Sequence, residues 1–97
     1  MVETKVFIAE LLGSFFFFSV ILTVVADPSI NIMAIPIALL GAIYFGGKIS
    51  GGHFNPAVTI MMLLKGKIEL MLSFVYIIAQ ILGAIFAVLL NNYLFYI

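Results

Sequence analysis

Residues 46–59 read GGKISGGHFNPAVT, a glycine-rich run that lies between two hydrophobic segments. Asparagine is a favoured N-cap and proline a favoured first helical residue, so Asn55-Pro56 predicts the start of a helix. This helix would end near Lys65 after about nine residues, or about 13 Å, which is less than half of the hydrocarbon core of a bilayer. Irregular backbone at membrane depth must lie against protein or along a wet cavity. We therefore predict a re-entrant loop and half-helix over residues 46–65.

The overall composition indicates an integral membrane protein. The chain has 97 residues, of which 66% are hydrophobic and 8% charged, and its mean hydropathy is +1.39. A soluble domain of this size is far less apolar. Cysteine is absent and there is a single histidine, so we expect no enzyme activity, no metal site and no cofactor. The net charge is zero and the sequence contains no arginine, so the chain lacks the positive charge with which proteins bind nucleic acid.

Three hydrophobic segments are candidates for crossing the membrane: residues 6–26, 30–45 and 68–90. The first matches a hydrocarbon core of about 30 Å and stops before Pro28, which cannot continue a helix. A cleaved signal peptide is the alternative for this segment, but its length and Glu10 favour a retained span. The second segment is short and holds Pro36, which predicts a kink or a tilt set by packing. We predict an all-α membrane protein with three transmembrane helices and one re-entrant half-helix.

The lysines predict how this arrangement is oriented. All four fall on one side when the chain crosses at the three predicted spans: Lys5, Lys48, Lys65 and Lys67. Cytoplasmic loops of membrane proteins carry an excess of basic residues. We therefore expect a multi-pass protein with its N-terminus in the cytoplasm and its C-terminus on the opposite side of the lipid bilayer.

The side chain of Asn55 suggests a use for the half-helix. Its oxygen can cap the helix by accepting a backbone N–H, which leaves the amide NH2 free to donate into a cavity. A neutral donor beside the positive end of a helix dipole orients a water oxygen and repels cations. Carbonyl groups of the preceding residues would accept hydrogen bonds from a passing solute: Gly51, Gly52, His53 and Phe54. The alternative for this motif is a simple turn between two ordinary helices.

Three segments carry a family resemblance: AELLGSF at residues 9–15, ISGGHFNPAVT at 49–59 and AQILGA at 79–84. In order and spacing they resemble the N-terminal half of the aquaporin and aquaglyceroporin family, the major intrinsic proteins, and the resemblance covers essentially the whole chain. Members of this family consist of two inverted repeats, each with three spans and one half-helix, whose two Asn-Pro-Ala motifs meet at the pore centre. The resemblance implies that residues 1–97 form one such half-repeat.

The resemblance also implies roles for individual residues. Asn55 would be the pore donor, Pro56 and Ala57 would form the junction of the half-helix, and His53 would line the cytoplasmic approach. Ile35 occupies the place where water-selective and glycerol-conducting members usually carry an aromatic selectivity-filter residue. The arginine of that filter belongs to the second repeat, so specificity for water does not transfer to this chain.

Glu10 and Gln80 resemble the buried polar residues that brace re-entrant loops in the family. A charged side chain is costly in a bilayer, so Glu10 should face the protein interior, where free N–H groups of the loop are suitable partners. We favour this structural brace over proton conduction. His53 could sense pH, but a loop-bracing or pore-mouth imidazole is the favoured interpretation.

A single half-repeat supplies one Asn-Pro-Ala motif and leaves irregular backbone facing lipid, so it needs an inverted companion. That companion would be a separate chain, the missing second half of a longer protein, or an antiparallel copy of this chain, which the lysine distribution disfavours. We expect a membrane channel subunit for passive transport of water or small uncharged solutes. The alternative is a non-conducting interaction or regulatory half-channel that assembles with a full-length family member.

Overall fold

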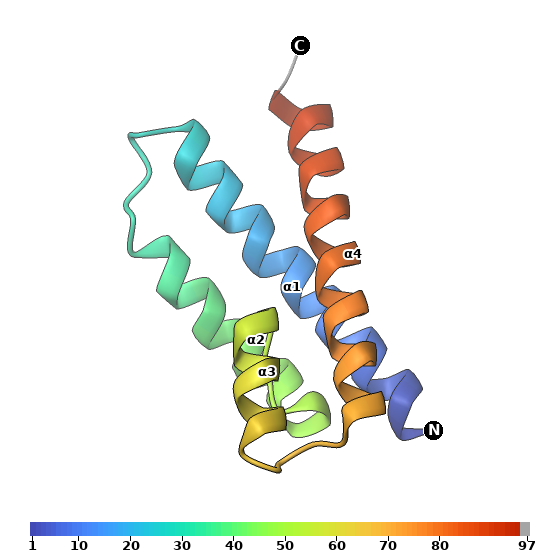
Figure 1. Ribbon diagram of the computed structural model, residues 1–97. Coiled ribbons are helices and arrows are strands. Elements are labelled where there is room, and N and C mark those ends of the chain that lie inside the picture. The colour runs from blue at the N-terminus through green and yellow to red at the C-terminus, as the bar shows by residue number, and fades with distance from the viewer. Residues whose placement is uncertain (96–97) are drawn as a thin grey trace.

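The computed structural model describes residues 1–95, which form four helices and no strand; Tyr96 and Ile97 lie outside the described part. The helices are α1 (Val2–Ala26), α2 (Ala34–Ser50), α3 (Pro56–Leu64) and α4 (Leu70–Phe95). α1 packs against both α2 and α4, and the short α3 packs on α4 (Figure 1). The prediction of an all-α protein is confirmed.

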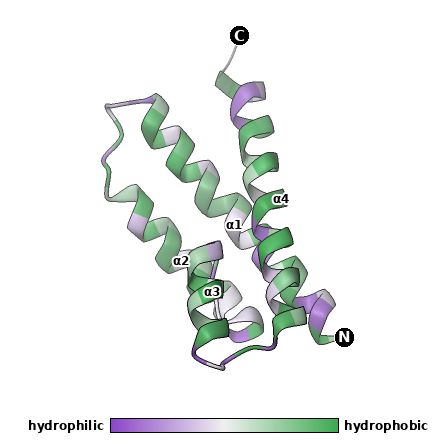
Figure 2. Ribbon diagram, viewed as in Figure 1, coloured by the Kyte–Doolittle hydropathy of each residue, from purple (hydrophilic) through white to green (hydrophobic). Residues whose placement is uncertain are grey.

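Two of the helices are long and apolar enough to cross a bilayer. α1 has 25 residues and α4 has 26, and their most apolar windows are only 17% and 33% buried inside the chain. The core helix of a soluble protein would be mostly buried, so these helices need an apolar surrounding. Figure 2 shows hydrophobic residues over most of their length. The chain is an integral membrane protein, in which α2 is apolar but shorter, with 17 residues.

Small residues set the distance between α1 and α4. A Cβ atom added to Gly83 of α4 would lie 2.9 Å from the Cβ of Ser14 and 3.0 Å from the backbone oxygen of Leu11. Ala79 and Ala87, one turn to either side of Gly83, are fully buried. Such a spacing of small residues lets two helix backbones approach closely in a membrane.

The start of α2 differs from the predicted span. The helix begins at Ala34 and not at residue 30, after a turn in which Asn31 Oδ1 accepts the N–H of Met33 at 2.8 Å. Pro36 therefore falls in the first turn, where backbone N–H groups have no helical partner to lose. At this position Pro36 removes no helical hydrogen bond, so it does not interrupt α2.

The end of α2 also differs, and the irregular loop is shorter than predicted. Gly46 and Gly47 remain helical, and the helix continues to Ser50. It stops there because Gly51 adopts a left-handed φ of 87°, a common way to end a helix. Only residues 51–55 then separate α2 from α3.

The charged residues lie near the two ends of the molecule. The segments that carry lysine lie together at the end that holds the N-terminus (Figure 1), with residues Lys5, Lys48, Lys65 and Lys67. At the other end, α1 stops before Asp27, whose carboxylate accepts hydrogen bonds from the Ser29 N–H at 3.0 Å and Oγ at 2.7 Å. These two bonds stabilise the charged form and lower the pKa of Asp27.

Replacing Gly83 by alanine should destabilise the fold. The new Cβ would press on backbone atoms of α1 at 3.0 Å, and overpacking of this kind costs about 1–3 kcal/mol. Gly41→Ala in α2 is the matched control, because nothing lies within 4 Å of a Cβ added there. Thermal unfolding in detergent, followed by circular dichroism, should show a lower midpoint for Gly83→Ala alone. Equal midpoints for the two variants would contradict this account of the α1–α4 contact.

Candidate functional site

The carboxylate of Glu10 holds the loop, residues 51–55, from within the helix bundle. Oε2 accepts hydrogen bonds from the Ser50 hydroxyl and from the His53 N–H at 3.0 Å. Oε1 accepts from the Phe54 N–H and from Gln80 Nε2, both at 2.8 Å. Glu10 is fully buried, and an ionised carboxylate can only accept, so four donors match it. These charge-assisted bonds offset the cost of burying the group.

A second set of contacts ties α3 and α4 to the loop. Gln80 Nε2 also donates to Thr59 Oγ1 at 2.9 Å, and this oxygen lies 2.9 Å from His53 Nδ1. The His53 ring stacks on Tyr76 with 4.1 Å between ring centroids and 16° between planes. The Tyr76 hydroxyl donates to the backbone oxygen of Ser50. We call this buried group the polar cluster: Glu10, Ser50, His53, Thr59, Tyr76 and Gln80.

Every N–H group of residues 51–54 donates to a partner within the chain. The first donates to Gly47 O at 2.8 Å and the second to Ser50 Oγ at 3.1 Å, while the third and fourth donate to Glu10. Irregular backbone requires such partners where no water can supply them. The remaining polar backbone groups of these four residues are carbonyl oxygens, and of the four only Gly51 is exposed.

Phe54 directs the chain from the loop into α3. Its φ of 51° is uncommon for a residue other than glycine, and its side chain is fully buried. Gly13 and Gly46 leave room for the ring, because a Cβ added to them would lie 2.1 Å and 3.0 Å from its atoms. Strained backbone persists only where its surroundings hold it. Here the ring pocket and the hydrogen bond to Glu10 do so.

Asn55 is the N-cap of α3. Its backbone is extended, with a φ of −165°, and its side-chain Oδ1 accepts the N–H of Ala57 at 2.8 Å. Pro56 occupies the first helical position, as is common. The Asn55 side chain is exposed, and its hydrogen bond uses the oxygen and not the amide NH2. An amide donor therefore stands on the surface of the chain at the positive end of the α3 dipole.

Comparison with known proteins shows to which family this arrangement belongs. Residues 1–96 match the family model described as Major intrinsic protein. The chain is a member of the major intrinsic protein family. Members of this family are channels rather than enzymes, and the resemblance inferred from the sequence is confirmed.

Similar proteins of the family carry names that refer to water or glycerol channels. The glycerol uptake facilitator protein-like 6 of Lactiplantibacillus plantarum is 43% identical over 85 residues, which are 84% of this chain and 39% of that protein. A probable aquaporin TIP-type of Medicago truncatula is 54% identical over 50 residues, 52% of this chain and 20% of that protein. The glycerol uptake facilitator protein of Buchnera aphidicola is 48% identical over 54 residues, 56% of this chain and 20% of that protein. This major intrinsic protein thus spans two-fifths or less of the length of these relatives.

The residues singled out in the sequence of this major intrinsic protein fall into three groups. Glu10, Gln80 and the loop residues Gly52, His53 and Phe54 meet around the polar cluster. Asn55, Pro56 and Ala57 begin α3. Ile35 is separate from both groups, because it lies at the start of α2 whereas the cluster contacts the end of that helix at Ser50.

Three members of the polar cluster were not singled out in the sequence: Ser50, Thr59 and Tyr76. Thr59 is the only hydroxyl residue in the apolar helix PAVTIMMLL, which is a signal because an isolated polar group in such a helix needs a partner. Tyr76 precedes Gln80 by four residues, so the two share a helix face. Ser50 gives no comparable signal, because serine is common beside glycine in any turn.

Replacing Glu10 by glutamine should loosen the loop without changing the size of the side chain. On either side the new NH2 group would face one backbone N–H that cannot accept, that of His53 or that of Phe54, and a buried donor left unpaired costs about 1–3 kcal/mol. Amide hydrogen exchange at His53 and Phe54 should therefore become faster. Glu3→Gln, an exposed change on the same helix, is the control and should leave exchange unaltered. Protection that survives Glu10→Gln would show that the carboxylate does not hold the loop.

Proposed function

We propose that this chain is a channel subunit for passive transport of water or small uncharged solutes, and that a second, inverted repeat completes its pore. The observation that carries the proposal is the geometry at Asn55. Its oxygen caps α3, while its amide NH2 stands exposed beside the helix N-terminus. A neutral donor next to a positive dipole end binds a solute oxygen and disfavours cations.

The loop supplies the complementary groups in this proposal. The N–H groups of residues 51–54 are consumed inside the chain, and the carbonyl oxygens of Gly51, Gly52, His53 and Phe54 would accept hydrogen bonds from a solute. Of these four residues, Gly51 is exposed. Alternating donors and acceptors would replace the water that a solute loses at a narrow point. The buried His53 ring would act by holding this backbone, since it stacks on Tyr76. Ile35 would occupy the place of the aromatic selectivity-filter residue in this pore.

The proposal needs an inverted companion because this chain supplies only one half-helix. The chain supplies one capped half-helix of nine residues, about 13 Å long, which cannot span the hydrocarbon core. In inverted-repeat membrane proteins, a second half-helix approaches the midplane from the other face. We place the N-terminus in the cytoplasm, because the segments with lysine gather at that end.

A non-conducting half-channel is the second candidate. It rests on the match to the relatives, whose aligned parts are 39% of one and 20% of two others, and on the single half-helix that the described residues contain. In this case the chain would assemble with a full-length member of the family and regulate it. The two candidates differ in whether solute passes Asn55.

Permeability of vesicles tests the channel. We expect osmotic shrinkage, followed by stopped-flow light scattering, to exceed that of empty vesicles when this chain is reconstituted with the second half of a full-length relative. Asn55→Leu should return shrinkage to the level of empty vesicles, because it removes the donor. The exposed change Leu64→Ala at the far end of α3 is the control. Unchanged flux in Asn55→Leu would refute the assignment of Asn55 as the donor. If no reconstituted mixture conducts, the channel proposal fails and the non-conducting half-channel is the remaining candidate.

A second substitution separates the donor from the cap. Aspartate is as good an N-cap as asparagine and its ionised carboxylate only accepts hydrogen bonds, so Asn55→Asp should keep α3 but lose the donor. We expect the protection of the α3 amides in hydrogen exchange to be retained while permeability falls at least about tenfold, as when a preorganised donor is lost. If permeability instead tracks the protection of α3, the role of Asn55 is structural.

A further inference from the structure

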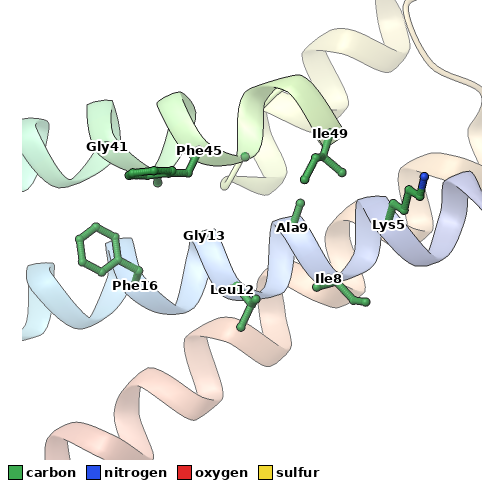
Figure 3. A pocket seen from close by; sticks show the side chains of 11 residues that line it. Lys5, Ile8, Ala9, Leu12, Gly13, Phe16, Gly41, Phe45 and Ile49 are labelled. Atoms are coloured by element: carbon green, nitrogen blue, oxygen red, sulfur yellow. The ribbon is translucent and has the colours of Figure 1, made fainter.

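The polar cluster does not open into the groove between α1 and α2. This groove of about 540 Å³ is lined by apolar side chains such as Ile8, Phe16 and Phe45 and by Lys5 at one end (Figure 3). None of the described residues that line it belongs to the polar cluster. Whatever fills the groove, the polar groups of the cluster are not reached from it.

The hydrogen bonds that run from Glu10 to His53 have a fixed direction. The ionised carboxylate of Glu10 only accepts, so the group of Gln80 that lies 2.8 Å from it must be the NH2 and not the oxygen. The second hydrogen of this NH2 donates to Thr59 Oγ1 at 2.9 Å. The amide cannot turn over without placing its oxygen against the carboxylate. Gln80 Oε1 accordingly has no partner within residues 1–95, although it is buried.

The hydroxyl hydrogen of Thr59 then has one acceptor. The oxygen of Thr59 accepts from Gln80 and lies 2.9 Å from His53 Nδ1, and within the described chain these are its two hydrogen-bond partners. Thr59 is fully buried, so water does not supply a third. A buried hydroxyl whose hydrogen points at no acceptor is costly. The hydrogen therefore points at Nδ1, which must be the unprotonated nitrogen of the ring.

The proton of the neutral His53 ring is consequently on Nε2. This atom lies on the edge of the ring that faces Gly51, because a Cβ added to that glycine would stand 3.7 Å from it. Gly51 is exposed, and 8% of His53 is exposed. Nε2 is not among the buried side-chain atoms that lack a partner in residues 1–95, so it is reached from outside the chain.

We propose that Thr59 is a positioning residue that fixes His53 as the neutral Nε2–H form, which makes the ring a second donor at the loop surface beside Gly51. The charge of Glu10 sets the direction of the hydrogen bonds. The tautomer follows from contacts inside the chain and does not require permeation. That the new donor meets a solute rests on the proposed function, in which Asn55 is the first donor.

The protonation of the ring can be measured directly, because the chain contains a single histidine. The full chain is labelled with nitrogen-15 and carbon-13 in histidine and reconstituted in vesicles near neutral pH. Solid-state NMR distinguishes a protonated ring nitrogen from an unprotonated one. We expect the proton on Nε2, and an unprotonated Nδ1 that accepts a hydrogen bond. A proton on Nδ1, alone or together with one on Nε2, would overturn the proposal.

Substitution of Thr59 tests its hydroxyl. Thr59→Val removes the hydroxyl and keeps the shape of the side chain, so the Nδ1 resonance should move to the higher shift of a nitrogen that accepts no hydrogen bond. Thr59→Ser should keep the wild-type shift. Thr23→Val, which removes a hydroxyl near the other end of α1, is the control and should keep it too.

Amide protection at His53 and Phe54 shows whether the loop is folded in each variant, and Thr59→Ala replaces Thr59→Val if the latter loses this protection. An unchanged Nδ1 shift in the folded variant without the hydroxyl would mean that Thr59 only packs, and would overturn its role.

Contact with water tests the second donor. The labelled chain is combined with the unlabelled second half of a full-length relative, and transfer of magnetisation from water to the Nε2 proton is measured. We expect this transfer in a mixture that conducts, and conducting vesicles without it would refute the donor at the loop surface. If no mixture conducts, the proposed function fails, whereas the tautomer measured in the chain alone still decides the role of Thr59.

Discussion

The fold depends on the buried carboxylate of Glu10, which accepts hydrogen bonds from backbone N–H groups of the loop. Glu10 receives hydrogen bonds from two loop N–H groups and from side chains on α2 and α4. Without it, the buried His53 and Phe54 would leave their N–H groups unpaired, which costs about 1–3 kcal/mol each. Without the loop, Glu10 would be a buried charge with no partner. Each therefore makes the other possible, and the position of Asn55 follows from both.

Local chemistry explains which features the sequence could predict. Asn55-Pro56 predicts a helix start because capping needs only neighbouring residues. Partners for Glu10 were predictable because a charge in a bilayer must be paired. Gly46 and Gly47 were interpreted as helix breakers, but both lie within the continuous helix α2. Gly46 instead makes room for the ring of Phe54. That use depends on a contact between distant segments, which no local pattern encodes, and the roles of Ser50 and Tyr76 were hidden for the same reason.

The polar cluster also determines the direction in which the N–H groups of the loop point. Donors point inward to Glu10 and Ser50, and of the loop residues only Gly51 and Asn55 are exposed. An exposed neutral donor at a positive helix end suits a solute that carries an accepting oxygen. It suits an isolated cation poorly, because the dipole of α3 opposes positive charge at the point where the donor stands. The same inward bonds that stabilise the loop thus favour uncharged solutes.

The distribution of lysine bears on what completes the structure. An antiparallel copy of this chain would carry its four lysines to the opposite face of the membrane, against the preference of basic residues for the cytoplasmic side. A different second repeat, with its own basic residues on the cytoplasmic side, avoids this conflict while still presenting an inverted half-helix. It would also bring residues that this chain lacks, since the sequence contains no arginine. For the channel that we propose, the charge pattern therefore favours a pore assembled from two unlike halves, to which this chain would contribute Asn55.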